Sequence, residues 1–319
     1  MPEYAIAVTG LHKSYGTHDV LRGVDLHVPT GTVFALLGPN GAGKTTVVTI
    51  LSTLLRPDAG RVRVAGHDLA TEPDAVRAAI GVTGQFSAVD GLLTGEENLR
   101  LMADLHHLPR AEARERAREL LERFDLTGIA AKPASSCSGG MRRRLDLAMT
   151  LVGSPQVIFL DEPTTGLDPR SRRDLWACVR DLVAAGVTVF LTTQYLEEAD
   201  QLADDVAVLD GGRIVAQGSP AHLKTLVPGG HVRLNLPDES ALALARRTLP
   251  GAVADPDALT LQLPADGVAA LRSVLDRLDA AGVDPAGLTT HTPDLDDVFL
   301  ALTGHGAGSS DDDRKPVLS

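Results

Sequence analysis

The chain has 319 residues, of which 44% are hydrophobic and 23% are charged, and its formal net charge at pH 7 is −12. This length exceeds the usual size of one domain, so we expect two domains. The negative net charge argues against a nucleic-acid-binding protein, because neutralising phosphates requires clustered lysine and arginine side chains. The cysteines Cys137 and Cys178 provide neither a disulfide framework nor a set of zinc ligands.

No apolar segment of the sequence approaches the roughly 20 residues needed to cross a bilayer. The N-terminal residues lack the basic stretch and apolar core of a signal peptide. We therefore expect a cytoplasmic protein whose role at a membrane, if it has one, depends on a partner.

The N-terminal part of the chain alternates apolar strands with helical segments. The expected elements are strands at 4–9, 25–28 and 33–37, a glycine-rich turn at 38–43, a helix at 45–55, and later strands at 157–160 and 187–191. The alternation predicts an α/β fold with a mostly parallel sheet that helices cover on both faces. We expect a helix-rich subdomain over about 86–152.

The pattern changes near residue 218. The elements expected beyond it are strands at 231–236, 259–263 and 286–291 and helices at 239–248, 267–282 and 294–302. This order predicts a small α+β domain of the ferredoxin-like type. We therefore divide the chain into a first domain over 1–222, an accessory domain over 223–304 and a disordered tail over 305–319.

The segment 38–45 fits the pattern of a phosphate-binding loop between a strand and a helix. Its glycines let backbone N–H groups converge on phosphates, the following helix adds a partial positive charge, and Lys44 adds a full one. Thr45 offers a hydroxyl group to Mg²⁺. The expected ATP-binding residues are Gly38, Pro39, Asn40, Gly41, Ala42, Gly43, Lys44, Thr45 and Thr46. A glycine-rich turn without a ligand is the alternative interpretation.

Two carboxylates follow the apolar run at 157–160. Asp161 and Glu162 stand at the C-terminal end of this expected strand, where parallel sheets bind their ligands. Asp161 can hold Mg²⁺, and Glu162 can polarise an attacking water molecule. Strands that end in acidic residues are common, but the combination with a phosphate-binding loop is specific.

Ser138, Gly139 and Gly140 open a helix and make a second anion-binding N-terminus. A nucleotide bound at Lys44 has no need of this segment. The economical interpretation is that it contacts the γ-phosphate held by another subunit, whereas a flexible helix start is the alternative.

With these residues in this order, the chain resembles the ATP-binding subunits of ABC transporters over about residues 4–222. It is most similar to the daunorubicin/doxorubicin-resistance type of ATP-binding protein. The segments that carry this closer similarity are 137–141 (Cys-Ser-Gly-Gly-Met), 192–200 (Thr-Thr-Gln-Tyr-Leu-Glu-Glu-Ala-Asp) and 292–300 (Thr-Pro-Asp-Leu-Asp-Asp-Val-Phe-Leu).

The resemblance implies further roles. Tyr15 would stack on adenine, Gln85 would touch Mg²⁺ and water and connect to the membrane partner, and Asp168 would lie in a loop that communicates across a dimer. Such subunits work as head-to-tail homodimers that sandwich two molecules of ATP with Mg²⁺. They act at the cytoplasmic face of the cell membrane, on a separate integral membrane permease.

Two departures from the family pattern are visible. The segment 137–141 begins with Cys137 and ends with Met141, where leucine and glutamine are usual, but its Ser-Gly-Gly core is kept. Gln194 stands where most relatives have a histidine that faces the γ-phosphate. A glutamine amide donates a hydrogen bond but does not titrate. We expect Gln194 to be a catalytic residue, but the sequence does not determine how fast ATP is hydrolysed with glutamine in place of histidine.

The leading hypothesis is therefore a transport ATPase that exports a hydrophobic drug or antibiotic, with a lipid or polysaccharide as the next choice of cargo. An ABC ATPase acting on ribosomes or DNA would require tandem nucleotide-binding domains with a basic linker or a long coiled coil, and the sequence has neither. A nucleotide sensor without turnover would lack Glu162, which is present.

Overall fold

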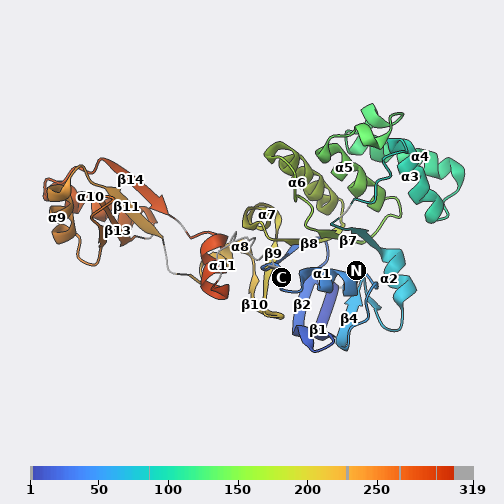
Figure 1. The fold of residues 1–319 in the computed structure, drawn as a ribbon, viewed down its shortest axis with the longest axis horizontal. Coiled ribbons are helices and arrows are strands. Elements are labelled where there is room, and N and C mark those ends of the chain that lie inside the picture. Colours follow the sequence, from blue (N-terminus) through green and yellow to red (C-terminus); the bar gives the residue numbers. More distant parts are fainter. Residues whose placement is uncertain (1–2, 86, 228–229, 266, 292, 305–319) are drawn as a thin grey trace, which may run out of the picture. The chain divides into compact units, whose positions relative to one another are not determined.

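The computed structural model describes residues 3–85, 87–227, 230–265, 267–291 and 293–304. They form two compact units, of which the first ends at Pro220 and the second begins at Ala221 (Figure 1). The tail that we expect to be disordered, 305–319, lies outside the described residues. Among the helices in the described ranges, none is both long enough and apolar enough to span a bilayer.

An antiparallel sheet begins the first unit. Its strands, in spatial order, are β2 (His18–Pro29), β1 (Tyr4–Tyr15), β4 (Ala59–Val64) and β5 (His67–Asp68). The expected strands at 4–9 and 25–28 are therefore longer than the sequence indicated. The pairing of β1 and β2 shifts between Val8 and Leu11. At this irregularity Gly10 has a φ of +59° and donates its N–H to Asp25 Oδ1 at 2.6 Å, so the apolar alternation stops although the strand continues.

The second sheet of this unit is mostly parallel, as predicted. Its spatial order is β10 (Arg213–Gly218), β9 (Asp205–Asp210), β3 (Val33–Leu37), β8 (Thr188–Thr193), β7 (Val157–Asp161) and β6 (Ile80–Thr83). Only the β10–β9 pairing among these is antiparallel. Every residue of β3, β7 and β8 is buried, which explains the apolar runs 33–37, 157–160 and 189–191 within them.

Helix α1 (Lys44–Leu51) packs between the two sheets. Val47 and Ile50 from this helix share one core with residues of β1 and with Phe34 of β3. The helix ends before the expected residue 55, because Thr53 adopts a left-handed φ of +66°.

The remaining helices of the first unit are α2 (Pro73–Ala79), α3 (Gly95–Leu105), α4 (Arg110–Arg123), α5 (Gly139–Thr150), α6 (Pro169–Ala184) and α7 (Leu196–Leu202). Helices α3, α4 and α5 gather into the helix-rich region expected over 86–152 (Figure 1). Thr94 and Glu97 form a capping box at the start of α3, which satisfies the first backbone N–H groups of that helix. The short helix α8 (Pro220–Lys224) follows β10.

The second unit has the element order of the predicted ferredoxin-like fold. Its elements are β11 (His231–Asn235), α9 (Glu239–Thr248), β12 (Val253–Asp255), β13 (Thr260–Pro264), α10 (Gly267–Ala280), β14 (Gly287–His291) and α11 (Leu295–Thr303). The antiparallel sheet has the order β12-β13-β11-β14. Strand β12 is absent from the sequence-based expectation because three residues are too few to show a period-2 pattern.

Candidate functional site

The candidate site lies where four neighbouring parallel strands end. In the register of the sheet, Leu37 of β3 pairs with Thr193 of β8, and Asp161 of β7 pairs with Thr192. Strand β6 pairs with β7 up to Thr83. The segments that follow these strands therefore leave the sheet at one edge, which is the usual ligand-binding edge of a parallel sheet. The phosphate loop, Glu162, Gln194 and Gln85 all lie in these segments, so the structure brings together the parts of the chain that carry these expected site residues.

The phosphate loop wraps around its own lysine. Lys44 is only 6% exposed, and its Nζ donates to the backbone oxygens of Gly38 at 2.7 Å and Pro39 at 3.1 Å. Burial lowers the pKa of Lys44, while the nearby carboxylates of Glu162 and Asp161 oppose that shift. A phosphate group at the loop would compensate the buried positive charge and raise the pKa of Lys44 again.

Two glycines of the loop are required by its close packing. A Cβ atom on Gly38 would lie 2.4 Å from the backbone oxygen of Leu209 in β9. Gly43 has a φ of +107°, and a Cβ there would lie 2.8 Å from Leu21 of β2. These contacts hold the loop in place between the two sheets, independently of any phosphate.

Thr192, a residue that sequence reasoning missed, holds the carboxylate of Asp161 and the backbone of Glu162. The Thr192 hydroxyl donates to Asp161 Oδ1, and it accepts the backbone N–H of Glu162 at 3.2 Å. Glu162 has a left-handed φ of +47°, which is uncommon for a residue with a Cβ. A further bond from its N–H to the backbone oxygen of Thr192, at 3.1 Å, supports this conformation. Thr165 donates to Glu162 Oε2 at 3.3 Å, which orients the carboxylate.

The residues expected to hold Mg²⁺ offer oxygen ligands only. They are the exposed hydroxyl of Thr45, the buried carboxylate of Asp161 and the exposed amide of Gln85. Hydroxyl, carboxylate and amide oxygens are the donors that Mg²⁺ prefers, so this set fits the ion. Their coordination of Mg²⁺ stays a prediction.

Arg143 of α5 joins the ends of β6 and β7 to the helical region, and sequence reasoning missed it too. Its guanidinium group is buried and donates to the backbone oxygens of Pro163 at 2.8 Å, Gly84 at 2.9 Å and Asp161 at 3.3 Å. It also forms an ion pair with Asp146 at 3.2 Å. One side chain therefore fixes the backbone directly before Gln85 and on both sides of Glu162. The sequence offered only a run of three arginines, from which the buried member cannot be distinguished.

The Arg143–Asp146 pair is costly to bury. Burial lowers the pKa of Arg143 and raises that of Asp146, and each partner opposes the shift of the other. Asp146 also accepts the backbone N–H of Ala88 at 3.1 Å, which extends the connection beyond Gln85. Removing one member would leave the other charge buried without a partner.

Helices α5 and α6 bring the segment 138–140 next to Asp168. Ser138 is the N-cap of α5, and its hydroxyl accepts the N–H of Met141 at 3.2 Å. A Cβ on Gly140 would lie 2.5 Å from the hydroxyl of Ser171, so the two helices approach closely. The Ser171 hydroxyl donates to Asp168 at 2.6 Å, and this bond together with backbone N–H groups lowers the pKa of Asp168. Ser138 and Asp168 are exposed, so a second molecule can reach both.

Gln194 and Tyr15 occupy more open positions. Gln194 is half-buried between β8 and α7. Four residues later, Glu198 is buried and accepts the indole N–H of Trp176 in α6 at 3.1 Å, which anchors α7. Tyr15 is 52% exposed at the end of β1, with the ammonium group of Lys13 5.8 Å from its ring centre. Contacts of Gln194 and Tyr15 with a nucleotide stay predictions.

Replacing Arg143 tests whether it positions the strand ends. Arg143→Met should lower the free energy of unfolding by about 3–5 kcal/mol, because it leaves Asp146 as an uncompensated buried charge. The double variant Arg143→Met/Asp146→Leu should recover most of that stability. It should not recover ATP hydrolysis, because the bonds to Gly84 and Pro163 are still missing. Urea unfolding and steady-state ATPase assays measure the two effects, with Arg144→Lys as the control.

Full ATPase activity in the double variant would contradict this positioning role. An unchanged free energy of unfolding in Arg143→Met would contradict the cost assigned to the buried pair.

Comparisons with known proteins agree with this geometry. The family described as ABC transporter matches residues 21–165. The daunorubicin resistance ATP-binding protein DrrA3 of Streptomyces coeruleorubidus is 52% identical, with 95% of this chain and 97% of the relative covered. The daunorubicin/doxorubicin resistance ATP-binding protein DrrA of Streptomyces peucetius is 48% identical, with 98% and 95% covered. A Nod factor export ATP-binding protein I of Ralstonia nicotianae is 39% identical, with 94% of each covered.

Solved structures agree as well. An ATP-binding subunit of an ABC transporter is similar with a TM-score of 0.62 and 29% identity, over 70% of this chain and 92% of the other. A nucleotide-free ATP-binding cassette from an ABC transporter has a TM-score of 0.62 and 27% identity, over 68% and 91%. The chain therefore belongs to the ATP-binding, ATP-hydrolysing subunits of ABC transporters.

Proposed function

We propose that this chain drives export of a hydrophobic drug or antibiotic by closing a head-to-tail homodimer around two molecules of MgATP. The observation that carries the proposal is the convergence of Lys44, Asp161, Glu162 and Gln194 at adjacent strand ends. Phosphoryl transfer depends mainly on positioning and charge stabilisation, and these groups provide both.

Each residue has a distinct role in this proposal. Lys44 and the loop N–H groups hold the phosphates, and Glu162 accepts a proton from the attacking water molecule. Thr192 holds the backbone N–H of Glu162, and Thr165 orients its carboxylate. Mg²⁺, held by Thr45, Asp161 and Gln85, would neutralise charge on the phosphates. Tyr15 would stack on adenine, and Gln194 would donate a hydrogen bond towards the γ-phosphate.

The dimer explains why Ser138 and Asp168 are exposed. The helix N-terminus at Ser138 favours an anion, and we assign it the γ-phosphate of ATP bound to the partner copy. The Asp168 carboxylate lies near this helix N-terminus. The Ser171 hydroxyl is the main cause that lowers the pKa of Asp168, so this carboxylate stays ionised. Each active site would then take Lys44 from one copy and Ser138 from the other.

The proposed cargo and the proposed direction of transport are inferred from the names of the relatives. Those named for daunorubicin or doxorubicin resistance support an antibiotic, and those named for Nod factor export support outward transport. A separate integral membrane permease would carry the cargo. The ATPase would work on the cytoplasmic face of the cell membrane, where MgATP is available. We also propose that residues 1–222 form the ATPase domain and 223–304 an accessory domain.

The homodimer can be tested with Glu162→Gln. This variant should keep MgATP binding but slow hydrolysis by roughly 10²–10⁴-fold, the usual contribution of general-base assistance. Trapped MgATP should then hold two chains together. Size-exclusion chromatography with light scattering should show a dimer with MgATP and a monomer with MgADP. A variant that stays monomeric at saturating MgATP, both alone and with its membrane partner, would contradict the proposal.

Gln194 can be tested by comparing Ala and His variants. If Glu162 alone polarises water, Gln194→Ala should cost about one hydrogen bond, roughly 0.5–1.5 kcal/mol, or roughly twofold to thirteenfold in rate. Gln194→His should remain active and add a pH dependence between about 6 and 8, because imidazole titrates in that range. ATPase rates of the three proteins across this range measure both effects. Wild-type rates in both variants, without a new pH dependence in the His variant, would show that position 194 does not face the nucleotide.

A further inference from the structure

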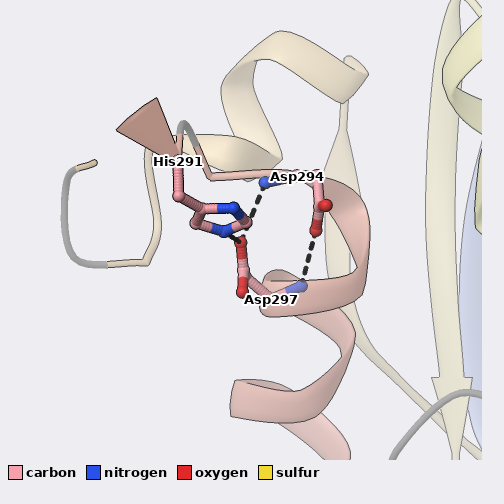
Figure 2. Close-up of side chains that lie close together, drawn as sticks. All are labelled: His291, Asp294 and Asp297. Carbon is pink, nitrogen blue, oxygen red and sulfur yellow. Dashed lines mark hydrogen bonds and ion pairs between the residues drawn. The ribbon is translucent and has the colours of Figure 1, made fainter. Parts of the chain in front are cut away.

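A cluster of one histidine and two aspartate side chains lies in the second unit, and none of these residues is assigned to the ATP site. His291 ends β14, and Asp294 and Asp297 begin α11 (Figure 2). One ligand atom from each of the three lies within 4.8 Å of those of the other two. His291 Nε2 is 2.7 Å from Asp297 Oδ2, and Figure 2 shows these two groups pointing toward each other.

A second imidazole stands beside the first. His231 of β11 is the direct antiparallel partner of His291, and their ring centres are 4.7 Å apart. Both rings and Asp297 line one pocket of about 430 Å³. The rest of its lining is mainly apolar: Val227, Pro293, Leu300 and Ala301. The pocket thus presents two imidazoles and a carboxylate from three different elements.

Helix capping accounts for the acidic residues but not for the histidines. Asp294 and Asp297 form a capping box in which each carboxylate accepts the backbone N–H of the other residue, both at 3.0 Å. That arrangement uses Asp294 Oδ1 and Asp297 Oδ2 and needs no imidazole. A ring nitrogen of histidine that carries no proton can bind a metal ion. An imidazole beside two carboxylates is a donor set of transition-metal sites.

We propose that His291, Asp294 and Asp297 bind a divalent transition-metal ion, and that Zn²⁺ suits this set best. Zn²⁺ takes imidazole nitrogen and carboxylate oxygen in four-coordinate sites. Mg²⁺ prefers oxygen ligands only, so the Mg²⁺ of the ATP reaction does not compete for this site. The ion would join the end of β14 to the first turn of α11, and would therefore stabilise the second unit.

The experiment uses the full chain without an affinity tag, stripped with EDTA and free of nucleotide. Equilibrium dialysis with Zn²⁺ should give one tightly bound ion per chain, and Co²⁺ should give a visible absorption band that Zn²⁺ abolishes. Millimolar Mg²⁺ should change neither result. His291→Ala and Asp297→Asn should each weaken Zn²⁺ binding by at least about tenfold, and the rise in melting temperature on adding Zn²⁺ should disappear.

The variants are chosen so that loss of folding cannot imitate loss of binding. Asn at 297 keeps an oxygen for the N–H of Asp294, and the melting temperatures of all variants are compared in EDTA. His67→Ala is the matched control, since His67 forms a similar pair with Glu72, at 3.3 Å, in the first unit. It should leave Zn²⁺ binding unchanged. Absence of a tight Zn²⁺ equivalent in the wild-type chain, or equal affinity in His291→Ala and Asp297→Asn, would overturn the proposal.

Discussion

The buried charge of Lys44 is the constraint on which the nucleotide site depends. A buried ammonium group is costly unless hydrogen bonds and opposite charges compensate it. Two loop carbonyls approach it directly, while Asp161 and Glu162 act on it from the end of β7. The carbonyls require a loop that folds back on itself, and the carboxylates require the sheet order β3-β8-β7. The remaining demand for negative charge suits the phosphates of ATP, the ligand of this family.

Arg143 is a second buried cation, but its compensation comes from the protein itself. Three backbone oxygens and Asp146 accept its hydrogen bonds. Lys44 therefore binds a ligand, whereas Arg143 stabilises the protein structure around that ligand. Because Arg143 lies on the helix that Ser138 caps, it links the segment assigned to the partner's phosphate to the strand ends that hold Glu162. A displacement of α5 on dimer closure would thus reach the catalytic carboxylate through a few hydrogen bonds.

The sequence predicted those parts whose pattern is local. Strands β3 and β7 are buried on both faces and read as apolar runs, and the glycine loop has a fixed spacing. Thr192 was missed because a threonine in a strand carries no local sign that it will bind Asp161 and the backbone of Glu162 on the neighbouring strand. The pairing of His231 with His291 could not be predicted from the sequence either, because it depends on the register between strands whose paired residues are sixty positions apart. The left-handed Thr53 that ends α1 early depends on tertiary packing as well.

The most direct test of the account is MgATP binding by Lys44→Ala. The wild-type chain should bind one MgATP and hydrolyse it. The variant should remain folded but bind roughly 10- to 150-fold more weakly, since a hydrogen bond to a charged group contributes about 1.5–3 kcal/mol. Lys132→Ala, which removes an exposed lysine, should match the wild type. Isothermal titration calorimetry of the three proteins gives the comparison. An unchanged affinity in Lys44→Ala would contradict the assignment of the loop and, with it, the proposed mechanism.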